Sequence, residues 1–261
     1  MPKATALEIT ESTASGIPPV EHRPGIHLSL QGKGGVGKSL VASILAQYLR
    51  GSGRTIQCID TDPVNRTFSQ YSGLEASRLE LMRDGNVDPR GFDRLMERLL
   101  TENGTFVIDN GASTFIPLWS YIVENQVIDI LREAGKRLYV HTVITGGQAL
   151  LDTVNGFRSL AQSTTDQNVI VWINEYFGRV ERDGKTLADM AAYTENADKV
   201  FGSVHIPKRN PDTFGRDIED VVSKKLTFHE AVTNGDFSLM TKQRLKVVQR
   251  DLFEQLDALG L

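Results

Sequence analysis

Short apolar runs separated by longer amphipathic segments dominate the chain from residue 25 onward. Six such runs occupy residues 26–30, 55–59, 105–108, 138–144, 169–173 and 200–206. Runs of this length fit buried strands, whereas the segments between them repeat apolar residues at helical spacing. Strands that alternate with helices are typical of a parallel sheet covered on both faces. The pattern therefore predicts an α/β fold with one doubly wound, mainly parallel sheet and helices on both faces.

The helix expected after the first run has clear limits. Leu40, Ile44 and Tyr48 recur at helical spacing, and Gly51 or Gly53 would end the helix. Its length suits a crossover between two parallel strands. In such sheets ligands gather beyond the carboxyl ends of the strands, so the residues that follow each run are the first candidates for a site.

The last segment, about 238–259, is predicted to form an amphipathic helix with a basic first half. Three interpretations of it remain: docking on the chain's own sheet, which we favour, pairing with a partner or a second copy, and lying on a membrane surface. Asp251, Glu254 and Asp257 would face anionic headgroups, which makes a membrane the least favoured partner. The apolar positions follow steps of three or four residues: Leu245, Val248, Leu252, Leu256 and Leu259.

Composition limits the class of protein. Hydrophobic residues make up 40% and charged residues 24% of the 261 positions, which is enough for a sizeable core in one soluble domain over residues 25–261. Residues 1–24 hold small residues and prolines without a sustained period, so we expect a flexible tail. The net charge of -4 argues against broad binding to nucleic acid.

The location is inferred from what the sequence does and does not contain. Cys58 is the one cysteine and lies in an apolar run, where we expect a buried strand residue in a reducing compartment. The N-terminus lacks a secretory pattern, and no apolar stretch reaches the length of a membrane span. We therefore expect a cytoplasmic protein. The five histidines show no metal-ligand spacing with Cys58, which argues against a zinc site.

A glycine-rich octapeptide follows the first apolar run and opens the first expected helix. Its glycines would let backbone N–H groups converge on phosphate oxygens, assisted by the positive end of the helix. Lys38 would reach the β and γ phosphates of ATP, and the Ser39 hydroxyl would bind Mg²⁺. A glycine-rich turn without a ligand is the alternative. The predicted nucleotide-contacting residues are Gly32, Lys33, Gly34, Gly35, Val36, Gly37, Lys38, Ser39 and the adjoining Leu40.

Carboxylates follow the second and third runs and should converge near this loop. Carboxylates would repel the negative charge of a triphosphate unless they hold Mg²⁺ or orient a water molecule. We assign Asp109 to the outer shell of the metal, Asp62 to positioning of the attacking water, and Asp60 to support of the metal or of the loop. Turn formation or helix capping is the alternative for each of them.

The loop KGGVGKS, the segment DTDPVN at residues 60–65 and the strand-end Asp109 together resemble the ParA/MinD family of dimeric P-loop ATPases with a deviant Walker A motif. The resemblance covers roughly residues 25–235. It implies that Lys33 reaches across a homodimer interface to the partner's ATP, and that Asp62 orients the hydrolytic water. The chain departs from the family where Asn110 and Gly111 follow Asp109, which puts the second switch in doubt.

The resemblance also supplies expectations for the base and for partners. Asn174 matches an asparagine that pairs with adenine in the family, and Pro207 matches a segment that flanks the base. A turn-forming role is the alternative for Asn174. Several longer strings, among them HTVITGGQALLDTVNGF, resemble a conjugal-transfer subgroup of the family. This implies a role in conjugative transfer or plasmid maintenance, with conjugative-transfer proteins as partners.

Other segments give less direct signals. Residues 145–148 fit either a second helix N-terminus that faces the ligand or a plain strand-to-helix turn. Tyr176 and Phe177 precede turn-like residues 182–185, which predicts a protruding hairpin. Lys208, Arg209, Lys224 and Lys225 could join the C-terminal cations in a DNA-contacting face, but interspersed acids favour ordinary solvated surface, so DNA binding stays open.

Three functions remain in competition. The leading hypothesis is a Mg²⁺-dependent ATPase that forms a homodimer with ATP and separates after slow hydrolysis, so that partners read two states. The second is a metabolic P-loop enzyme of the kinase or ligase type, for which we find no added acid/base constellation. The third is a scaffold that holds nucleotide without hydrolysing it. Electron-transferring relatives are set aside, because Cys58 alone cannot hold a cluster between subunits.

Overall fold

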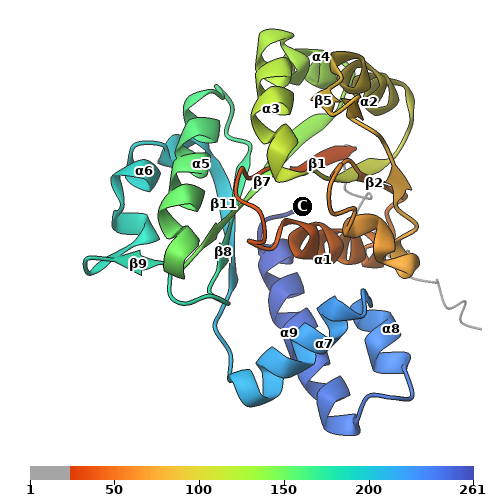
Figure 1. Ribbon diagram of the computed structural model, residues 1–261, viewed down its shortest axis with the longest axis vertical. Helices are drawn as coiled ribbons and strands as arrows, with labels where there is room; N and C mark the ends of the chain where they lie inside the picture. Colours follow the sequence, from red (N-terminus) through yellow and green to blue (C-terminus); the bar gives the residue numbers. More distant parts are fainter. Residues whose placement is uncertain (1–23) are drawn as a thin grey trace, which may run out of the picture.

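A seven-stranded parallel sheet forms the centre of the protein in a computed structural model that describes residues 24–261 (Figure 1). The strand order is β11–β8–β7–β1–β6–β2–β3, and every pairing in this sheet is parallel. The expected tail, residues 1–24, falls outside the described part except for Pro24. The six predicted runs are the strands β1 (Gly25–Ser29), β2 (Ile56–Asp60), β6 (Thr105–Asp109), β7 (Arg137–Thr145), β8 (Val169–Asn174) and β11 (Val200–Ile206).

The seventh strand, β3 (Ser77–Arg78), was missed by the sequence analysis. Both of its residues are exposed, so it leaves no apolar run in the sequence. Two short hairpins stand outside the sheet: β4 (Met82–Arg83) with β5 (Asn86–Val87), and β9 (Glu181–Arg182) with β10 (Lys185–Thr186). The second hairpin follows β8, as predicted from the turn-like residues there.

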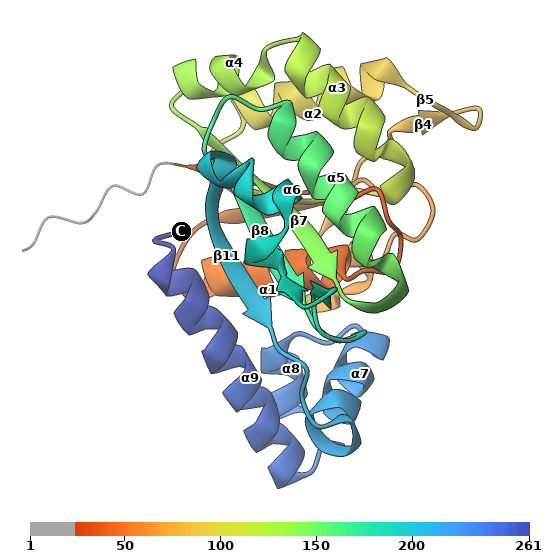
Figure 2. The ribbon, with the colours of Figure 1, turned by 90° about the vertical axis from the view of Figure 1, so that its left-hand side faces the viewer.

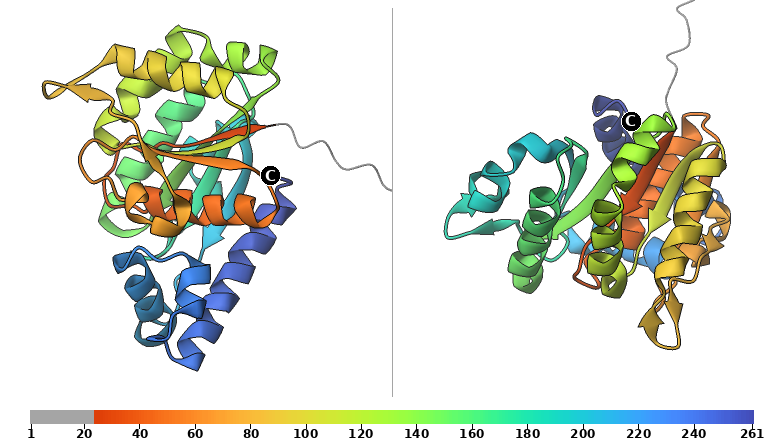
Figure 3. Two further views of the ribbon diagram at one scale, coloured as in Figure 1. Left: turned by 90° about the vertical axis from the view of Figure 1, so that its right-hand side faces the viewer. Right: turned by 90° about the horizontal axis from the view of Figure 1, so that it is seen from above.

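Helices cover both faces of the sheet, which confirms the predicted fold class (Figures 1 and 3). Because successive side chains in a strand point to opposite faces, Phe106 and Ile108 of β6 join one core and Val107 joins the other. The first core packs under α2 (Pro89–Thr101), α3 (Phe115–Glu124), α4 (Val127–Glu133), α5 (Leu150–Gln162) and α6 (Ala191–Thr194). The second packs under α1 (Lys38–Gly51), α7 (Arg216–Ser223), α8 (Phe228–Thr233) and α9 (Leu239–Ala258).

Short helical turns connect these elements. The 3-10 turns are η1 (Phe68–Gln70), η2 (Ser72–Leu74), η3 (Ala112–Thr114), η4 (Gly147–Ala149), η5 (Leu187–Asp189) and η6 (Ala197–Lys199), and one π-helical turn is η7 (Pro211–Gly215). Within residues 24–261 no helix is both long and apolar enough to span a lipid bilayer.

The C-terminal helix α9 is docked on the chain's own sheet, which supports the interpretation favoured from the sequence (Figure 2). Its buried face consists of Leu245, Val248, Leu252 and Leu256, four of the five predicted positions. Gln255 adds a polar contact with the outermost strand β11. Its Oε1 accepts a hydrogen bond from the backbone N–H of His205 at 2.7 Å, and its Nε2 donates to the His205 carbonyl at 3.0 Å.

Candidate nucleotide-binding site

The glycine-rich loop connects the carboxyl end of β1 to the start of α1. Gly35 and Gly37 have φ angles of 75° and 108°, in a region that glycine adopts without strain. A Cβ at Gly34 or Gly35 would meet no atom within 4 Å, so this side of the loop is open. The helix begins at Lys38, and the N–H groups of its first turn lack intrahelical partners. The loop therefore has the local structure that a phosphate group requires.

Lys38 lies almost buried between the loop and two carboxylates. Its side-chain Nζ donates a hydrogen bond to the carbonyl oxygen of Lys33 at 3.0 Å. Burial lowers the pKa of Lys38, while the nearby carboxylates of Asp109 and Asp62 oppose that shift. The structure thus places Lys38 with the predicted carboxylates, and its contact with phosphate stays a prediction.

Asp109 ends β6 as a buried carboxylate whose two oxygens accept no hydrogen bond from the described residues. Burial raises its pKa to about 7; the Ser39 hydroxyl, which is near but outside hydrogen-bond geometry, and Lys38 lower the pKa, whereas Asp60 and Asp62 raise it. A buried charge without partners is costly, so this position favours a cation or ordered water. Oxygen ligands of this kind suit Mg²⁺. Ser39 and Asp109 therefore fit the predicted metal site.

Asp60 and Asp62 organise the loop after β2. One oxygen of Asp60 accepts from the N–H of Asp62 at 3.0 Å and the other from the N–H of Ser69 at 2.7 Å. Asp62 Oδ1 in turn accepts from the N–H groups of Val64 at 2.8 Å and Asn65 at 3.1 Å. Asp60 has the loop-supporting role that was one of its two predicted roles. Metal binding by Asp60 and water positioning by Asp62 stay predictions.

Asn110, the point where the chain departs from the family pattern, joins the loops after β2 and β6. Its side-chain oxygen accepts from the hydroxyl groups of Thr61 at 3.2 Å and Thr114 at 2.8 Å, and its Nδ2 donates to the Gly111 carbonyl at 3.0 Å. A Cβ at Gly111 would lie 2.8 Å from Asp62 Oδ1, so the two loops touch there. Sequence reasoning missed this connection, although the polar strand-end position was a signal.

Gln31 is a second residue that sequence reasoning missed. It is 1% exposed, and its Nε2 donates to Thr142 Oγ1 at 3.3 Å and to the carbonyl groups of Val143 at 3.0 Å and Thr153 at 3.1 Å. Its Oε1 accepts from the N–H of Gly32 at 2.8 Å. Gln31 therefore fixes the start of the phosphate loop against β7 and α5.

Lys33, the additional lysine of the loop, stands at its exposed rim. Its Nζ forms an ion pair with Asp152 Oδ2 at 2.8 Å, and the two side chains are 46% and 56% exposed. Asp152 lies in the first turn of α5, which follows β7 at the same edge of the sheet. An exposed pair of this kind contributes at most about 1 kcal/mol, so Lys33 can exchange this partner at little cost.

Asn174 contacts the phosphate loop directly. Its Nδ2 donates to the carbonyl oxygen of Val36 at 3.0 Å, and its Oδ1 accepts from the N–H of Tyr176 at 3.1 Å. It therefore steadies the loop and the turn after β8, which agrees with the turn-forming alternative. Pairing with adenine stays a prediction.

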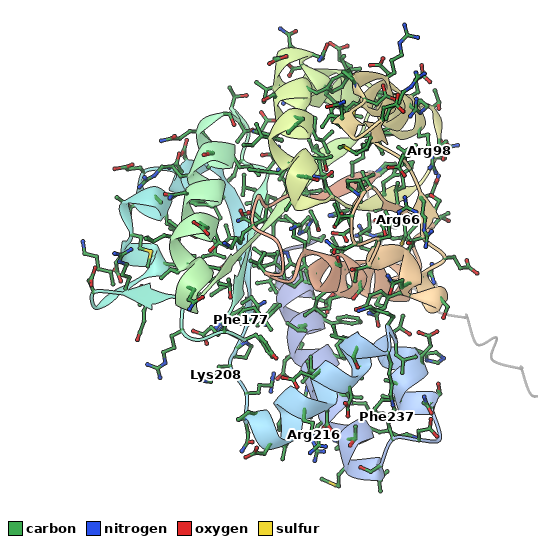
Figure 4. The ribbon with its side chains drawn as sticks, in the orientation of Figure 1. Arg66, Arg98, Phe177, Lys208, Arg216 and Phe237 are labelled. Carbon is green, nitrogen blue, oxygen red and sulfur yellow. The ribbon has the colours of Figure 1, made fainter. Side chains whose placement is uncertain are left out.

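A small apolar cavity of about 120 Å³ lies beside the first turns of α1, and two of the predicted residues, Leu40 and Pro207, line it. Tyr176, Lys208 and Phe214 also line it. Figure 4 shows Lys208 on the connection between the sheet and the lobe formed by α7, α8 and α9. Contact of Leu40 and Pro207 with a nucleotide base stays a prediction.

The strand-to-helix turn at residues 145–148 packs against the end of β8 and the segment that follows it. A Cβ at Gly146 would lie 2.3 Å from the carbonyl oxygen of Gly178, and Thr145 Oγ1 donates to the carbonyl of Asn174 at 2.8 Å. These contacts support the plain-turn interpretation. Cys58 is buried in β2 as predicted, and burial raises its pKa to about 12.

Exposed apolar side chains surround the carboxyl edge of the sheet. Each follows a different strand: Val64 follows β2, Ile116 follows β6, Leu151 follows β7 and Phe177 follows β8. Their exposed fractions are 74%, 69%, 49% and 53%. All four therefore lie in segments that follow the carboxyl ends of strands, the same end of the sheet as the phosphate loop.

The cations considered for a DNA-contacting face are partly engaged within the protein. Arg209 pairs with Asp251 at 2.7 Å, and Lys224 lies 4.9 Å from the ring centre of Phe237. These contacts agree with ordinary solvated surface.

Comparison with known proteins agrees with this geometry. Residues 29–214 match the family model described as the CobQ/CobB/MinD/ParA nucleotide binding domain. Protein TraL of Escherichia coli is 49% identical over 234 residues, which cover 89% of this chain and 97% of the relative. A second Escherichia coli protein of that name is 46% identical over 233 residues, with the same coverage. The resemblance to the conjugal-transfer subgroup is thus confirmed.

Two solved structures share the fold. A chain of the MinC:MinD cell division protein complex from Aquifex aeolicus has a TM-score of 0.51 at 14% identity, covering 88% of this chain and 96% of that chain. The septum site-determining protein MinD of Pyrococcus horikoshii, complexed with Mg-ADP, has a TM-score of 0.50 at 19% identity, covering 91% and 97%. The family match, the TraL relatives and the parallel P-loop fold agree, and the chain belongs to the CobQ/CobB/MinD/ParA nucleotide-binding family.

Proposed function

We propose that this protein is an ATP-binding and ATP-hydrolysing dimer switch that serves conjugative DNA transfer or the maintenance of a transferable element. The observation that carries the proposal is the place of Lys33, which stands half exposed at the end of the sheet where exposed apolar side chains also follow the strands. A second copy that covers this end of the sheet would bury those side chains. Lys33 would then leave Asp152 and pair with the triphosphate bound to that copy. The transfer role rests on the TraL relatives.

The residues of the loop divide the chemistry among them. Lys38 would neutralise charge on the β and γ phosphates, and Ser39 with Asp109 would hold Mg²⁺, which supplies charge neutralisation for phosphoryl transfer. Asp62 would orient the attacking water once its loop releases the hydrogen bonds to Val64 and Asn65. Hydrolysis would then remove the γ phosphate that draws the two copies together, and the dimer would separate.

The test combines ATP turnover with molecular mass in solution, for the wild type and for Lys33→Ala, Asp62→Ala and Lys185→Ala. Lys185 is an exposed lysine in the β9–β10 hairpin and serves as the matched control. We expect Asp62→Ala to accumulate an ATP-bound dimer, Lys33→Ala to remain monomeric, and Lys185→Ala to behave as wild type. A Lys33→Ala variant that still dimerises and hydrolyses ATP would overturn the switch. Transfer of phosphate to a metabolite would indicate a metabolic enzyme, and ATP binding without turnover would indicate a scaffold.

A further inference from the structure

A cavity in the described part of the chain lies away from the phosphate loop, at the amino-terminal edge of the sheet. It has a volume of about 630 Å³, within the range of small-molecule sites. Its walls include the first residues of β1 and β7 and the residues just before β2 and β8. The five residues of β1 separate it from the phosphate loop by about 16 Å. It is therefore a separate feature of the fold.

The charge on the cavity wall is predominantly positive. Arg54, Arg132 and Arg137 line it, together with Lys136, whose Nζ donates to the backbone carbonyl oxygens of Leu99 and Glu102. The one acidic side chain in the lining, Asp166, pairs with Arg132 at 2.5 Å. The guanidinium of Arg137 stacks 5.0 Å from the ring centre of Tyr139, in an orientation fixed by aromatic contact.

Three side chains on the wall carry buried nitrogen atoms without a hydrogen-bond partner among the described residues. They are Nε2 of His27, Nδ2 of Asn168 and Nε of Arg54. His27 and Asn168 are 1% and 2% exposed, so neither group is solvated by bulk water. Buried polar atoms are normally paired, and three such atoms around one cavity indicate that a partner is missing.

The tautomer of His27 follows from a hydrogen-bonded chain of three buried side chains. Trp172 Nε1 can only donate, and it lies 2.9 Å from His141 Nδ1, which must therefore accept. Burial lowers the pKa of His141 to about 3, so the ring is neutral and its proton resides on Nε2. That nitrogen lies 3.0 Å from His27 Nδ1, which accepts. The proton of the neutral His27 ring is consequently on Nε2, and this atom is a donor.

The free groups on the wall are thus all N–H donors. Gly25 lies against His27 Nε2, because a Cβ there would lie 2.7 Å from that atom. A cavity of small-molecule size with positive charge and unpaired donors is suited to an anion that offers hydrogen-bond acceptors. We propose that the cavity binds a small anion rich in phosphate or carboxylate oxygens, held by Arg54, Asn168 and His27.

The test titrates the full-length protein with inorganic pyrophosphate and, separately, with citrate, while the side-chain ¹⁵N and ¹H resonances of the histidines are followed by NMR. In the free protein the resonances of His27 should show the proton on Nε2. Saturation with either probe should shift the Nε2 and Hε2 resonances. Pyrophosphate bound at the phosphate loop would shift the backbone amides of residues 32–39 instead. Failure of the proposed function and failure of this proposal are therefore distinguishable.

Variants locate the binding site. We expect Arg54→Gln to weaken citrate binding about tenfold, because a charge-assisted hydrogen bond is lost. Arg83→Gln, on an exposed hairpin residue, is the matched control and should bind as wild type does. Gly25→Ala should suppress the His27 shift, because the added Cβ would lie 2.7 Å from Nε2 and displace the ring. An unchanged His27 resonance at about 10 mM of both probes, where even millimolar sites fill, would overturn the proposal. Equal weakening in Arg54→Gln and Arg83→Gln would overturn it too.

Discussion

The carboxyl and amino edges of the central sheet bury unpaired polar groups of opposite kinds. At the carboxyl edge Asp109 presents two acceptor oxygens without a donor, whereas at the amino edge His27 and Asn168 present donors without an acceptor. The first edge is complementary to a cation and the second to an anion. A motif marks the first edge in the sequence, and none marks the second, because its donors come from residues 27, 54 and 168 and meet only in the fold.

Acid also changes the contributions of the two edges to folding stability in opposite directions. The pKa of Asp109 is raised to about 7, so its ionised form opposes folding above that pH, and the protein gains stability as the pH falls toward 4. The pKa values of His27 and His141 are lowered by burial, so stability is lost as the pH falls below about 6.5. Substitutions at each edge can therefore separate the two contributions.

The largest effect is expected at the carboxyl edge, for ATP turnover by Lys38→Ala. Loss of a charge that neutralises phosphate oxygens should lower turnover about 100-fold or more. The measurement is phosphate release at saturating ATP, with Lys185→Ala as control. Turnover within threefold of wild type would remove Lys38 from the chemistry.

Asp109→Asn should stabilise the protein while it impairs the site. Without Mg²⁺ at pH 8 we expect a gain of about 2 to 4 kcal/mol in the free energy of unfolding, because an ionised buried carboxylate is replaced by a neutral amide. The gain should shrink as the pH falls through 7 and vanish near pH 4. Urea unfolding at several pH values in the presence of a chelator measures it. A variant no more stable than wild type at pH 8 would mean that this carboxylate has partners in solution.

Gly156→Ala tests how much the buried contacts of Gln31 contribute to stability at the carboxyl edge. A Cβ at residue 156 would lie 2.1 Å from Gln31 Oε1, so the buried amide must move, at a cost of about 1 to 3 kcal/mol. Gly51→Ala is the control, since a Cβ there meets no atom within 4 Å. Thermal unfolding of both variants gives the comparison, and equal melting temperatures would contradict the close packing.

His27→Phe tests the amino edge. The phenyl ring keeps the stacking on Tyr139, whose ring centre lies 5.0 Å away, but it cannot take up a proton. Between pH 6 and 4 the variant should lose less stability than wild type, by at most about 1.4 kcal/mol per pH unit. Urea midpoints across this range measure the slope. Parallel pH profiles would show that His27 does not titrate in this range.

The smallest effect is expected for Asp152→Ala, which removes the exposed partner of Lys33. The free energy of unfolding should change by no more than about 0.5 kcal/mol. The same variant should form the ATP-bound dimer at least as readily as wild type, because Lys33 no longer has a competing partner in its own chain. A loss of dimer in analytical ultracentrifugation would instead give Asp152 a direct part in the interface.

The sequence was sufficient for the six long strands, the helix after the phosphate loop and the C-terminal helix, since each has an apolar face of regular period. The two-residue strand β3 has no such face and could not be found. Motif spacing located Lys38, Ser39 and Asp109, which the structure brings together. The roles of Gln31 and Asn110 depend on partners distant in sequence, such as Thr153 for Gln31, and only the fold defines them.

The contact between Gln255 and His205 has a consequence for self-association. An outermost strand with free backbone groups is a template on which a strand from another molecule can add. Here a side-chain amide occupies one N–H and one C=O of that strand, so growth by edge-to-edge polymerisation is blocked at this point. At the β11 edge, association between copies is thereby directed to the faces and loops of the protein rather than to an open-ended extension of its sheet.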